Sequence, residues 1–322
     1  MDSSIAFDFD LTSFLFTIIR VMTPILCAAL ACMVFRKGGI DGIATEGIML
    51  ICALVGTLGS FFFQSAFLGV MTAVFFGIIM SFIYGYITII LKANQILAGI
   101  ALNIFAGGIT IFGIYYTTGQ KGSTAGLVGP VVPSVSLPII DSIPYLGRVL
   151  SNHNLLTYIA ILLVLILYFF LYRTPTGLRI RTVGENPEAA KSVGISILKY
   201  KYITLSIAGS MAGLGGAFMT LGYVSFFTRD MIAGRGFIGM AAESMGRGSP
   251  IGVLLSSVFF SVFDALGIQL QIIDVPPQLL HLLPYLGTII AIAFYSYYAK
   301  KNEGKPPSER KRFFSKRAKA VD

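Results

Sequence analysis

The sequence predicts an all-α protein that crosses a membrane about nine times. Only 12% of its 322 residues are charged, whereas 55% are hydrophobic and the mean hydropathy is +0.81. A soluble domain carries about 25% charged residues. The charges gather in short clusters between long uncharged runs, and these runs lack the alternation over about ten residues that marks the strands of a membrane barrel. Both features indicate a helical, polytopic membrane protein.

Each uncharged run is a candidate membrane helix, because about 20 apolar residues cross the hydrocarbon layer as a helix. In chain order the candidates are 11–35, 43–63, 66–91, 96–117, 154–172, 202–221, 232–246, 251–271 and 278–299. The seventh is short, which predicts a broken or partial span. We therefore expect one membrane domain at 1–300, with a first half at 11–172, a connecting loop at 173–201, a second half at 202–299 and a basic tail at 301–322.

The basic residues predict the orientation of these helices. When the loops are assigned to alternate sides, one side receives most of the 24 Lys and Arg residues, including those of loop 173–201 and of the tail after Tyr298. Such residues accumulate on the cytoplasmic side. We expect the N-terminus outside and the C-terminus inside. The net charge of +9 then reflects orientation and attraction to the lipid bilayer, rather than nucleic-acid binding.

Two glycine-spaced acidic segments recur in the two halves, "GIATEGIM" at 42–49 and "GMAAESMG" at 239–246. The matching positions are Gly39, Gly42, Ala44 and Glu46 in the first half and Gly236, Gly239, Ala241 and Glu243 in the second. They belong to the second and seventh candidate spans, which run in opposite directions. An inverted repeat with glycine-interrupted segments is typical of the central pathway of a transporter. The alternative is coincidence in a chain with 35 glycines.

Polar residues inside the spans are candidates for a solute pathway. A charge at the bilayer centre costs about 2.5–3.5 kcal/mol on insertion scales, so it should face protein or water. We predict a polar path lined by Glu46, Asn103, Glu243, Asp264 and Gln269. The alternative is a structural role, either in an ion pair such as Arg20 with Glu46 or in hydrogen bonds between helices.

The sequence does not indicate an enzyme. No H-E-x-x-H, G-x-S-x-G or G-x-x-x-x-G-K-[ST] motif occurs. Cys27, Cys32 and Cys52 lie inside candidate spans and lack the spacing of metal ligands. We therefore expect no catalytic residue, no metal site and no cofactor held by this chain.

The loop at 173–201 contains the signals of a short helix. Asn186 is a favourable N-cap, Pro187 suits the first helical position, Glu188 favours the positive end of the helix dipole, and Gly194 can end the helix in a left-handed conformation. About two turns would be marginal alone in water. Docking into a groove on another protein would stabilise them; the alternative is a connector on the membrane surface.

The segment "GLRIRTVGENPEAAKSVGI" resembles the cytoplasmic coupling segment of the ABC importer permeases that handle simple sugars, nucleosides and branched-chain amino acids. "RVMTPILCAAL", "GGIDGIATEGIMLICA", "NQILAGIALNIFAGGIT" and "GRGFIGMAAESMGRGSPIG" are similar to further signatures of that family, in the same order. The resemblance covers most of residues 18–300 and is closest to the nucleoside and simple-sugar branch. Gly42, Thr45 and the "ESM" before Gly246 depart from the usual pattern and leave the solute open.

This resemblance implies a multi-pass permease of the bacterial cytoplasmic membrane that imports nucleosides or related simple sugars. It also implies a second homologous permease, expected to form a heterodimer, an external solute-binding protein, and ABC ATPase subunits that carry ATP and Mg²⁺. The ATPase contact would comprise Gly184, Asn186, Pro187, Glu188, Ala189, Ala190 and Gly194. The alternatives are a branched-chain amino acid importer of the same type, an ion-coupled carrier that uses Glu46 and Glu243, and a membrane protein without a pathway.

Overall fold

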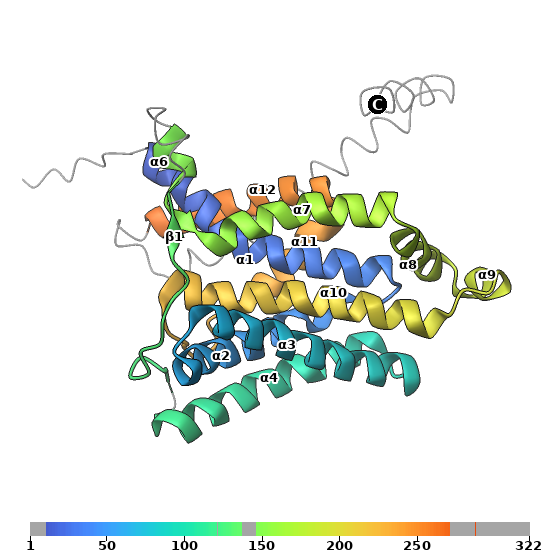
Figure 1. Cartoon of the computed structure of the whole chain (residues 1–322), viewed down its shortest axis with the longest axis horizontal. Coiled ribbons are helices and arrows are strands. Elements are labelled where there is room, and N and C mark those ends of the chain that lie inside the picture. Colours follow the sequence, from blue (N-terminus) through green and yellow to red (C-terminus); the bar gives the residue numbers. More distant parts are fainter. Residues whose placement is uncertain (1–10, 121, 137–145, 271–286, 288–322) are drawn as a thin grey trace, which may run out of the picture.

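The computed structural model describes residues 11–120, 122–136, 146–270 and 287. Seven stretches of this part are long and apolar enough to cross a membrane. They contain the long helices α1 (Leu11–Lys37), α2 (Thr45–Phe63), α3 (Ala66–Gly85), α4 (Gln95–Thr118), α7 (Leu155–Arg173), α10 (Ile197–Ala217) and α12 (Pro250–Leu270). These helices confirm seven of the predicted spans, and they lie side by side in one bundle (Figure 1).

Short irregular helices extend three of the spans. A 3₁₀ turn at Gly42–Ala44 precedes α2, and π-helical turns at Tyr86–Ile90 and Phe218–Val224 continue α3 and α10. A π-turn interrupts the regular backbone hydrogen bonds of an α-helix and is tolerated where packing holds it. The 3₁₀ turn at Gly42–Ala44 leads directly into the first residues of α2, Thr45 and Glu46.

The centre of the bundle is α1. About nine-tenths of its most apolar stretch is buried, and it packs against α10, α11 (Arg235–Met245) and α12. Small residues allow helices to approach closely where no hydrophobic effect drives them together. Gly77 of α3 and Gly209 of α10 mark one such approach, because a β-carbon on Gly77 would overlap the Gly209 carbonyl oxygen. By contrast, α4 lies at the edge of the bundle (Figure 1).

The seventh predicted span is a partial one. Helix α11 has 11 residues and is about 16 Å long, roughly half of the hydrocarbon thickness. The residues before it are irregular, and Ser225, Asp230, Ala233 and Gly234 have positive φ angles. Non-helical backbone at membrane depth is tolerated only where it is buried in protein or lines a water-filled cavity. The ninth predicted span, 278–299, lies outside the described residues.

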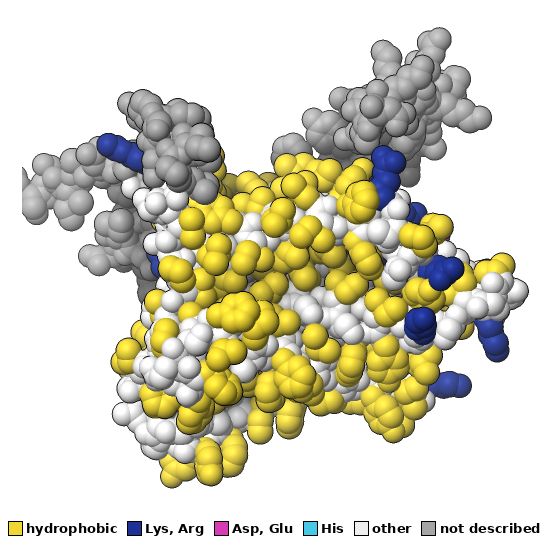
Figure 2. All heavy atoms as spheres, in the orientation of Figure 1, with side chains coloured by type: hydrophobic (Ala, Val, Ile, Leu, Met, Phe, Trp, Pro, Cys, Tyr) yellow, Lys and Arg dark blue, Asp and Glu magenta, His cyan; other side chains and the backbone are white. Residues whose placement is uncertain are grey.

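The two ends of the bundle differ. Short helices α8 (Pro175–Glu185) and α9 (Pro187–Ser192) project from one end, whereas α6 (Leu146–Leu150) and the short strands β1 (Ser134–Val135) and β2 (His153–Asn154) lie at the other (Figure 1). The strands pair antiparallel, with Ser134 opposite Asn154. In Figure 2 apolar side chains cover the side of the bundle, and most of the visible Lys and Arg side chains gather at the α8–α9 end.

Candidate functional site

The carboxylate of Glu46 binds the first turn of α11. It accepts hydrogen bonds from the backbone N–H of Gly234, at 2.8 Å, and of Gly236, at 2.6 Å. The N–H groups of a first helical turn have no partner within the helix and carry its positive dipole end. Glu46 therefore caps α11 from a different helix. The side chain of Arg20 instead donates to the Tyr223 carbonyl oxygen, so the structure contains no Arg20–Glu46 pair.

Asn103 of α4 is engaged with the backbone at the start of α2. Its Oδ1 accepts from the Gly47 N–H at 2.8 Å, and its Nδ2 donates to the Ile43 carbonyl oxygen at 2.9 Å. Both ends of the amide therefore stabilise the junction between the 3₁₀ turn and α2. Because Asn103 binds the backbone before and after Glu46, it helps to fix the position of Glu46.

Glu243 lies at the other end of α11, where it is almost fully buried. Its Oε2 is 2.8 Å from a guanidinium nitrogen of Arg36, near the end of α1. Each of the two glutamates thus contacts residues next to the other acidic segment. Glu46 binds the start of the second segment, and Glu243 binds Arg36, three residues before Gly39.

A third polar group joins α11 to α12. A guanidinium nitrogen of Arg235 lies 3.4 Å from the Asp264 carboxylate, and both side chains are largely buried. Two buried atoms, Arg235 Nε and Gln269 Oε1, have no hydrogen-bond partner within the part of the chain that the structure describes. A buried polar atom without a partner costs about 1–3 kcal/mol. The five predicted pathway residues therefore lie in three places: Glu46 with Asn103, Glu243 with Arg36, and Asp264 and Gln269 on α12.

The predicted helix in the connecting loop is confirmed as α9. Asn186 is its N-cap and accepts a hydrogen bond from the Ala189 N–H at 3.0 Å, and Gly194 follows it with a φ of +78°. Ala190 is buried, in a small apolar core with Ile180, Val183 and Tyr200. Glu188, Ala189 and Val193 are exposed, and Val193 is 72% exposed although it is apolar. Gly184 belongs to the helix before, α8.

Helix α8 was not predicted from the sequence. Thr174 is its N-cap and accepts from the Gly177 N–H, and Pro175 occupies its first position. The "TPTG" stretch carries this signal. Gly184 packs α8 against the end of α1, because a β-carbon there would overlap the Lys37 carbonyl oxygen.

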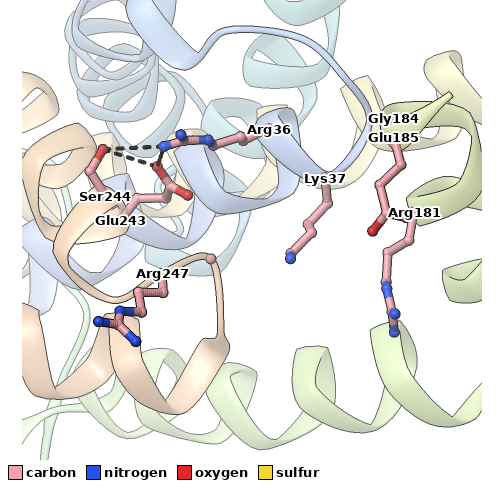
Figure 3. A pocket seen from close by; sticks show the side chains of 9 residues that line it. Arg36, Lys37, Arg181, Gly184, Glu185, Glu243, Ser244 and Arg247 are labelled. Atoms are coloured by element: carbon pink, nitrogen blue, oxygen red, sulfur yellow. Dashed lines mark hydrogen bonds and ion pairs between the residues drawn. The ribbon is translucent and has the colours of Figure 1, made fainter. Parts of the chain in front are cut away.

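A polar pocket of about 360 Å³ lies between the ends of α1, α8 and α11 (Figure 3). It is lined by Arg36, Lys37, Arg181, Gly184, Glu185, Glu243, Ser244, Arg247 and Gly248. From the sequence, these basic residues indicated only the orientation of the helices. Their convergence on one pocket depends on tertiary contacts and has no local sequence signal.

Comparisons with known proteins agree with this architecture. A family model described as branched-chain amino acid transport system / permease component matches residues 14–293. The nucleoside ABC transporter permease protein NupC of Lactococcus lactis is 30% identical over 85% of this chain and 89% of its own length. The guanosine ABC transporter permease protein NupQ of Bacillus subtilis is 34% identical over 84% and 87%.

The fold is also found among solved structures. PsaBC from Streptococcus pneumoniae, solved in complex with Fab, aligns with a TM-score of 0.50 and 15% identity over 86% of this chain and 89% of that one. The family match covers most of the chain, and seven of the predicted membrane spans are present in the described residues as long apolar helices. The chain therefore belongs to the family of branched-chain amino acid transport system permease components, and it is a multi-pass membrane subunit of an ABC importer.

Proposed function

We propose that this chain is the permease of an ATP-driven importer of nucleosides, with purine nucleosides such as guanosine as the first candidates. The observation on which the solute class depends is the similarity to NupC and NupQ, which extends over more than four-fifths of this chain. The membrane topology would place the N-terminus outside and the α8–α9 end in the cytoplasm, with the two acidic segments related as an inverted repeat.

The exposed face of α9 would bind the ATPase. A helix of six residues is too short to be stable alone, and the small core around Ala190 holds it in place. This arrangement leaves Glu188, Ala189 and Val193 available to a partner. An apolar side chain as exposed as Val193, on an element that projects from the bundle, suits a protein contact. ATP and Mg²⁺ would be held by that partner.

The solute path would pass the Arg235–Asp264 pair. The unsatisfied atoms of Arg235 and Gln269 offer one donor and one acceptor, which suit the hydroxyl groups of a ribose. Glu46, Asn103 and Glu243 would shape this path by fixing α2, α4 and α11, because their polar atoms bind protein groups. A second homologous permease would complete the path, and the face of α6, β1 and β2 would receive a solute-binding protein.

Uptake by whole cells tests this function. Cells that lack their own nucleoside uptake should accumulate radiolabelled guanosine when they express this chain with its cognate ATPase, second permease and solute-binding protein. Uptake should require an intact ATPase, and it should survive a protonophore while ATP is maintained. Unlabelled leucine should compete poorly.

Two results would overturn the proposal in different ways. Uptake that collapses with the proton gradient and persists without the ATPase would indicate an ion-coupled carrier. Uptake of labelled leucine but not of guanosine would retain the ABC mechanism and replace the solute class.

A further inference from the structure

The segment 225–234, which links the π-turn of α10 to α11, is irregular in conformation but partly buried. Phe227 and Ile232 are completely buried. At one end of the segment, the Gly234 N–H is bound by Glu46. Irregular backbone depends on hydrogen-bond partners outside its own element. The contacts at the other end of the segment therefore show what holds it in place.

The other end of this segment pairs with the chain that follows α4. Ser123 and Thr228 face each other in an antiparallel bridge that stands apart from the β1–β2 sheet. Backbone hydrogen bonds of 2.9 Å flank the bridge on both sides, from Thr124 to Phe227 and from Arg229 to Gly122. The Phe227 N–H also donates to the Thr124 hydroxyl at 2.9 Å, and both of these residues are completely buried. We call this contact between 122–124 and 227–229 the latch.

The residues that follow the latch, 125–132, form a strap that crosses this end of the bundle on its way to β1 (Figure 1). The strap contacts three spans: Ser60 of α2 donates to the Pro130 carbonyl oxygen, Val132 donates to Leu221 in the extension of α10, and Asn154 before α7 donates to the Val132 carbonyl oxygen. Gly129 lies against α2, because a β-carbon there would lie 2.9 Å from the Phe61 nitrogen. The strap is thus fixed to the bundle at 129–132, whereas the latch joins it to the segment before α11.

Few other contacts support the strap side of the latch. Residues 122–132 carry no charged side chain, so no ion pair reinforces it. A β-carbon on Gly122 or Gly126 would meet no described atom outside the neighbouring residues within 4 Å, which leaves open space on either side of Thr124. Contacts with few hydrogen bonds open at a lower free energy than a sheet or a helix. The latch can therefore separate while the strap stays fixed at 129–132.

We propose that the latch opens and closes the outer end of the solute path during each transport cycle. This inference rests on the proposed import function, which places the α6 end outside the cell. The closed latch holds Phe227 inside the bundle and keeps the segment 225–234 in place next to Arg235 of the proposed path. When the latch opens, this segment pivots about Gly234, whose φ of +82° marks the break before α11, while Glu46 still holds the start of that helix.

The latch should be closed at rest. Opening it exposes Phe227 and removes the partners of the Thr124 and Phe227 polar groups, which costs free energy. That free energy has to come from a partner that binds the open form more tightly than the closed one. In the proposed complex, the solute-binding protein at this end or the ATP-bound ATPase would supply it.

The geometry of the bridge allows the latch to be locked by a disulfide. Ser123 and Thr228 do not bond to each other, because the two backbone hydrogen bonds lie on either side of them. The Cα atoms of such a pair are about 4.5 Å apart, within the range of about 4.4–6.8 Å that a disulfide spans. Both side chains are partly exposed, so an oxidant reaches cysteines at these positions. The variant that combines Ser123→Cys with Thr228→Cys therefore closes the latch covalently.

Guanosine uptake by cells that express the whole complex tests the latch. Oxidation of the double variant should lower uptake at least about tenfold, because a covalently closed latch cannot leave the closed state, and dithiothreitol should restore it. Ser123→Cys and Thr228→Cys alone are the matched controls and should keep their uptake after the same oxidation. They also show that oxidation does not act through the buried Cys27, Cys32 and Cys52.

The rate of disulfide formation provides a second measurement that does not depend on the solute. In the purified complex, the disulfide is detected after denaturation as the loss of two polyethylene glycol–maleimide adducts from the double variant. If the latch opens during the cycle, oxidation should be several-fold slower in one of two states, nucleotide-free or trapped with ATP and vanadate. The single variants should lose no adduct to an internal disulfide.

The outcomes separate this inference from the proposed function. If guanosine uptake is present and the locked double variant still transports normally, the contact is a static brace and the latch is refuted, while import stands. If the unmodified complex takes up no guanosine, the proposed solute fails and the oxidation rates decide: equal rates in both nucleotide states refute the latch. Failure of the disulfide to form in either state would show that the two residues are not adjacent and would refute it as well.

Discussion

The backbone N–H of Gly236 donates a hydrogen bond of 2.6 Å to the carboxylate of Glu46, 190 residues earlier in the chain. This contact joins the two glycine-spaced acidic segments directly. A β-carbon on Gly236 would lie 2.6 Å from the Glu46 Cα, so glycine is needed at this position for α2 to reach the start of α11. The glycine and the glutamate therefore act together: one provides the space, and the other binds the exposed N–H groups of a half-length helix.

Replacement of Glu46 should destabilise the protein, and loss of its hydrogen-bond acceptors should cost more than loss of its charge alone. Glu46→Gln keeps one acceptor but removes the charge at the helix start, and should cost about 1 kcal/mol. Glu46→Leu leaves the N–H groups of Gly234 and Gly236 without acceptors, and should cost about 2–4 kcal/mol. Unfolding in detergent measures both. Glu188→Gln, at an exposed site, is the control and should shift the melting temperature far less than Glu46→Leu.

The same unfolding measurement distinguishes the role of Glu46 as a cap of α11 from an ion pair between Glu46 and Arg20. If Arg20 and Glu46 were paired, replacing both with Leu would restore the stability that Glu46→Leu loses, because an intact buried pair is often near neutral in net free energy. Arg20 is instead bound to the Tyr223 carbonyl oxygen and stacks on the Tyr223 ring. We expect the double variant to be less stable than either single one.

Glycine-to-alanine substitutions at two helical positions should differ in their effect on the stability of the protein. Gly236→Ala would force α2 and α11 apart and should cost about 1–3 kcal/mol. Gly108→Ala, in α4, places its methyl group where no described atom outside the neighbouring residues and the local helix backbone lies within 4 Å, and should be neutral or stabilise by up to about 1 kcal/mol. Thermal unfolding of the two variants checks the difference. Equal melting temperatures would contradict the close approach at Gly236.

Much of this fold could be predicted from the sequence, because spans and caps are encoded locally. Run length and hydropathy located the seven membrane helices, and Asn186, Pro187 and Gly194 located α9. The partners of the charged residues could not be predicted. Glu46 pairs with backbone N–H groups rather than with a side chain, and backbone donors leave no trace in residue identity. The hydrogen bond between Asn103 and the Gly47 N–H could not be predicted either, because its donor is also a backbone group.

His153, at the α6 end of the bundle, should make stability depend on pH. Its ring stacks on Phe16, with centroids 4.2 Å apart, and burial lowers its pKa below the ordinary value of about 6.5. The folded state therefore binds the proton less tightly than the unfolded chain. Stability should be fully present above pH 6.5 and should fall as the pH decreases toward the lowered pKa, by at most about 1.4 kcal/mol per pH unit.

His153→Phe should remove this acid-dependent component, because phenylalanine preserves the stacked ring and does not titrate. The chain's other histidine provides the control, since His281→Gln should retain the full pH dependence of His153. The measurement is the melting temperature between pH 7.5 and 5. An unchanged pH profile in His153→Phe would assign the acid sensitivity to other groups.

Substitutions at two neighbouring alanines of α9 should distinguish an effect on ATPase coupling from an effect on folding. Ala189 is exposed and Ala190 is completely buried against Ile180 and Val183. Ala189→Trp should keep the melting temperature of the isolated chain and abolish ATPase stimulation in the assembled complex, and Glu188→Arg should also abolish that stimulation. Ala190→Trp should lower the melting temperature by overfilling the small core. Normal transport by Ala189→Trp would make α9 a simple connector.

The predicted topology can be tested with two exposed serines at opposite ends of the bundle. Ser134 lies in β1 and Ser192 ends α9 (Figure 1). In intact cells an impermeant thiol reagent should label Ser134→Cys and spare Ser192→Cys, because the basic loops assign the α9 end to the cytoplasm. After the membrane is permeabilised, both should react. The three native thiols are buried, so the unmodified chain provides the unlabelled background. Labelling of Ser192→Cys from outside would reverse the orientation, and the α9 face could then no longer bind a cytoplasmic ATPase.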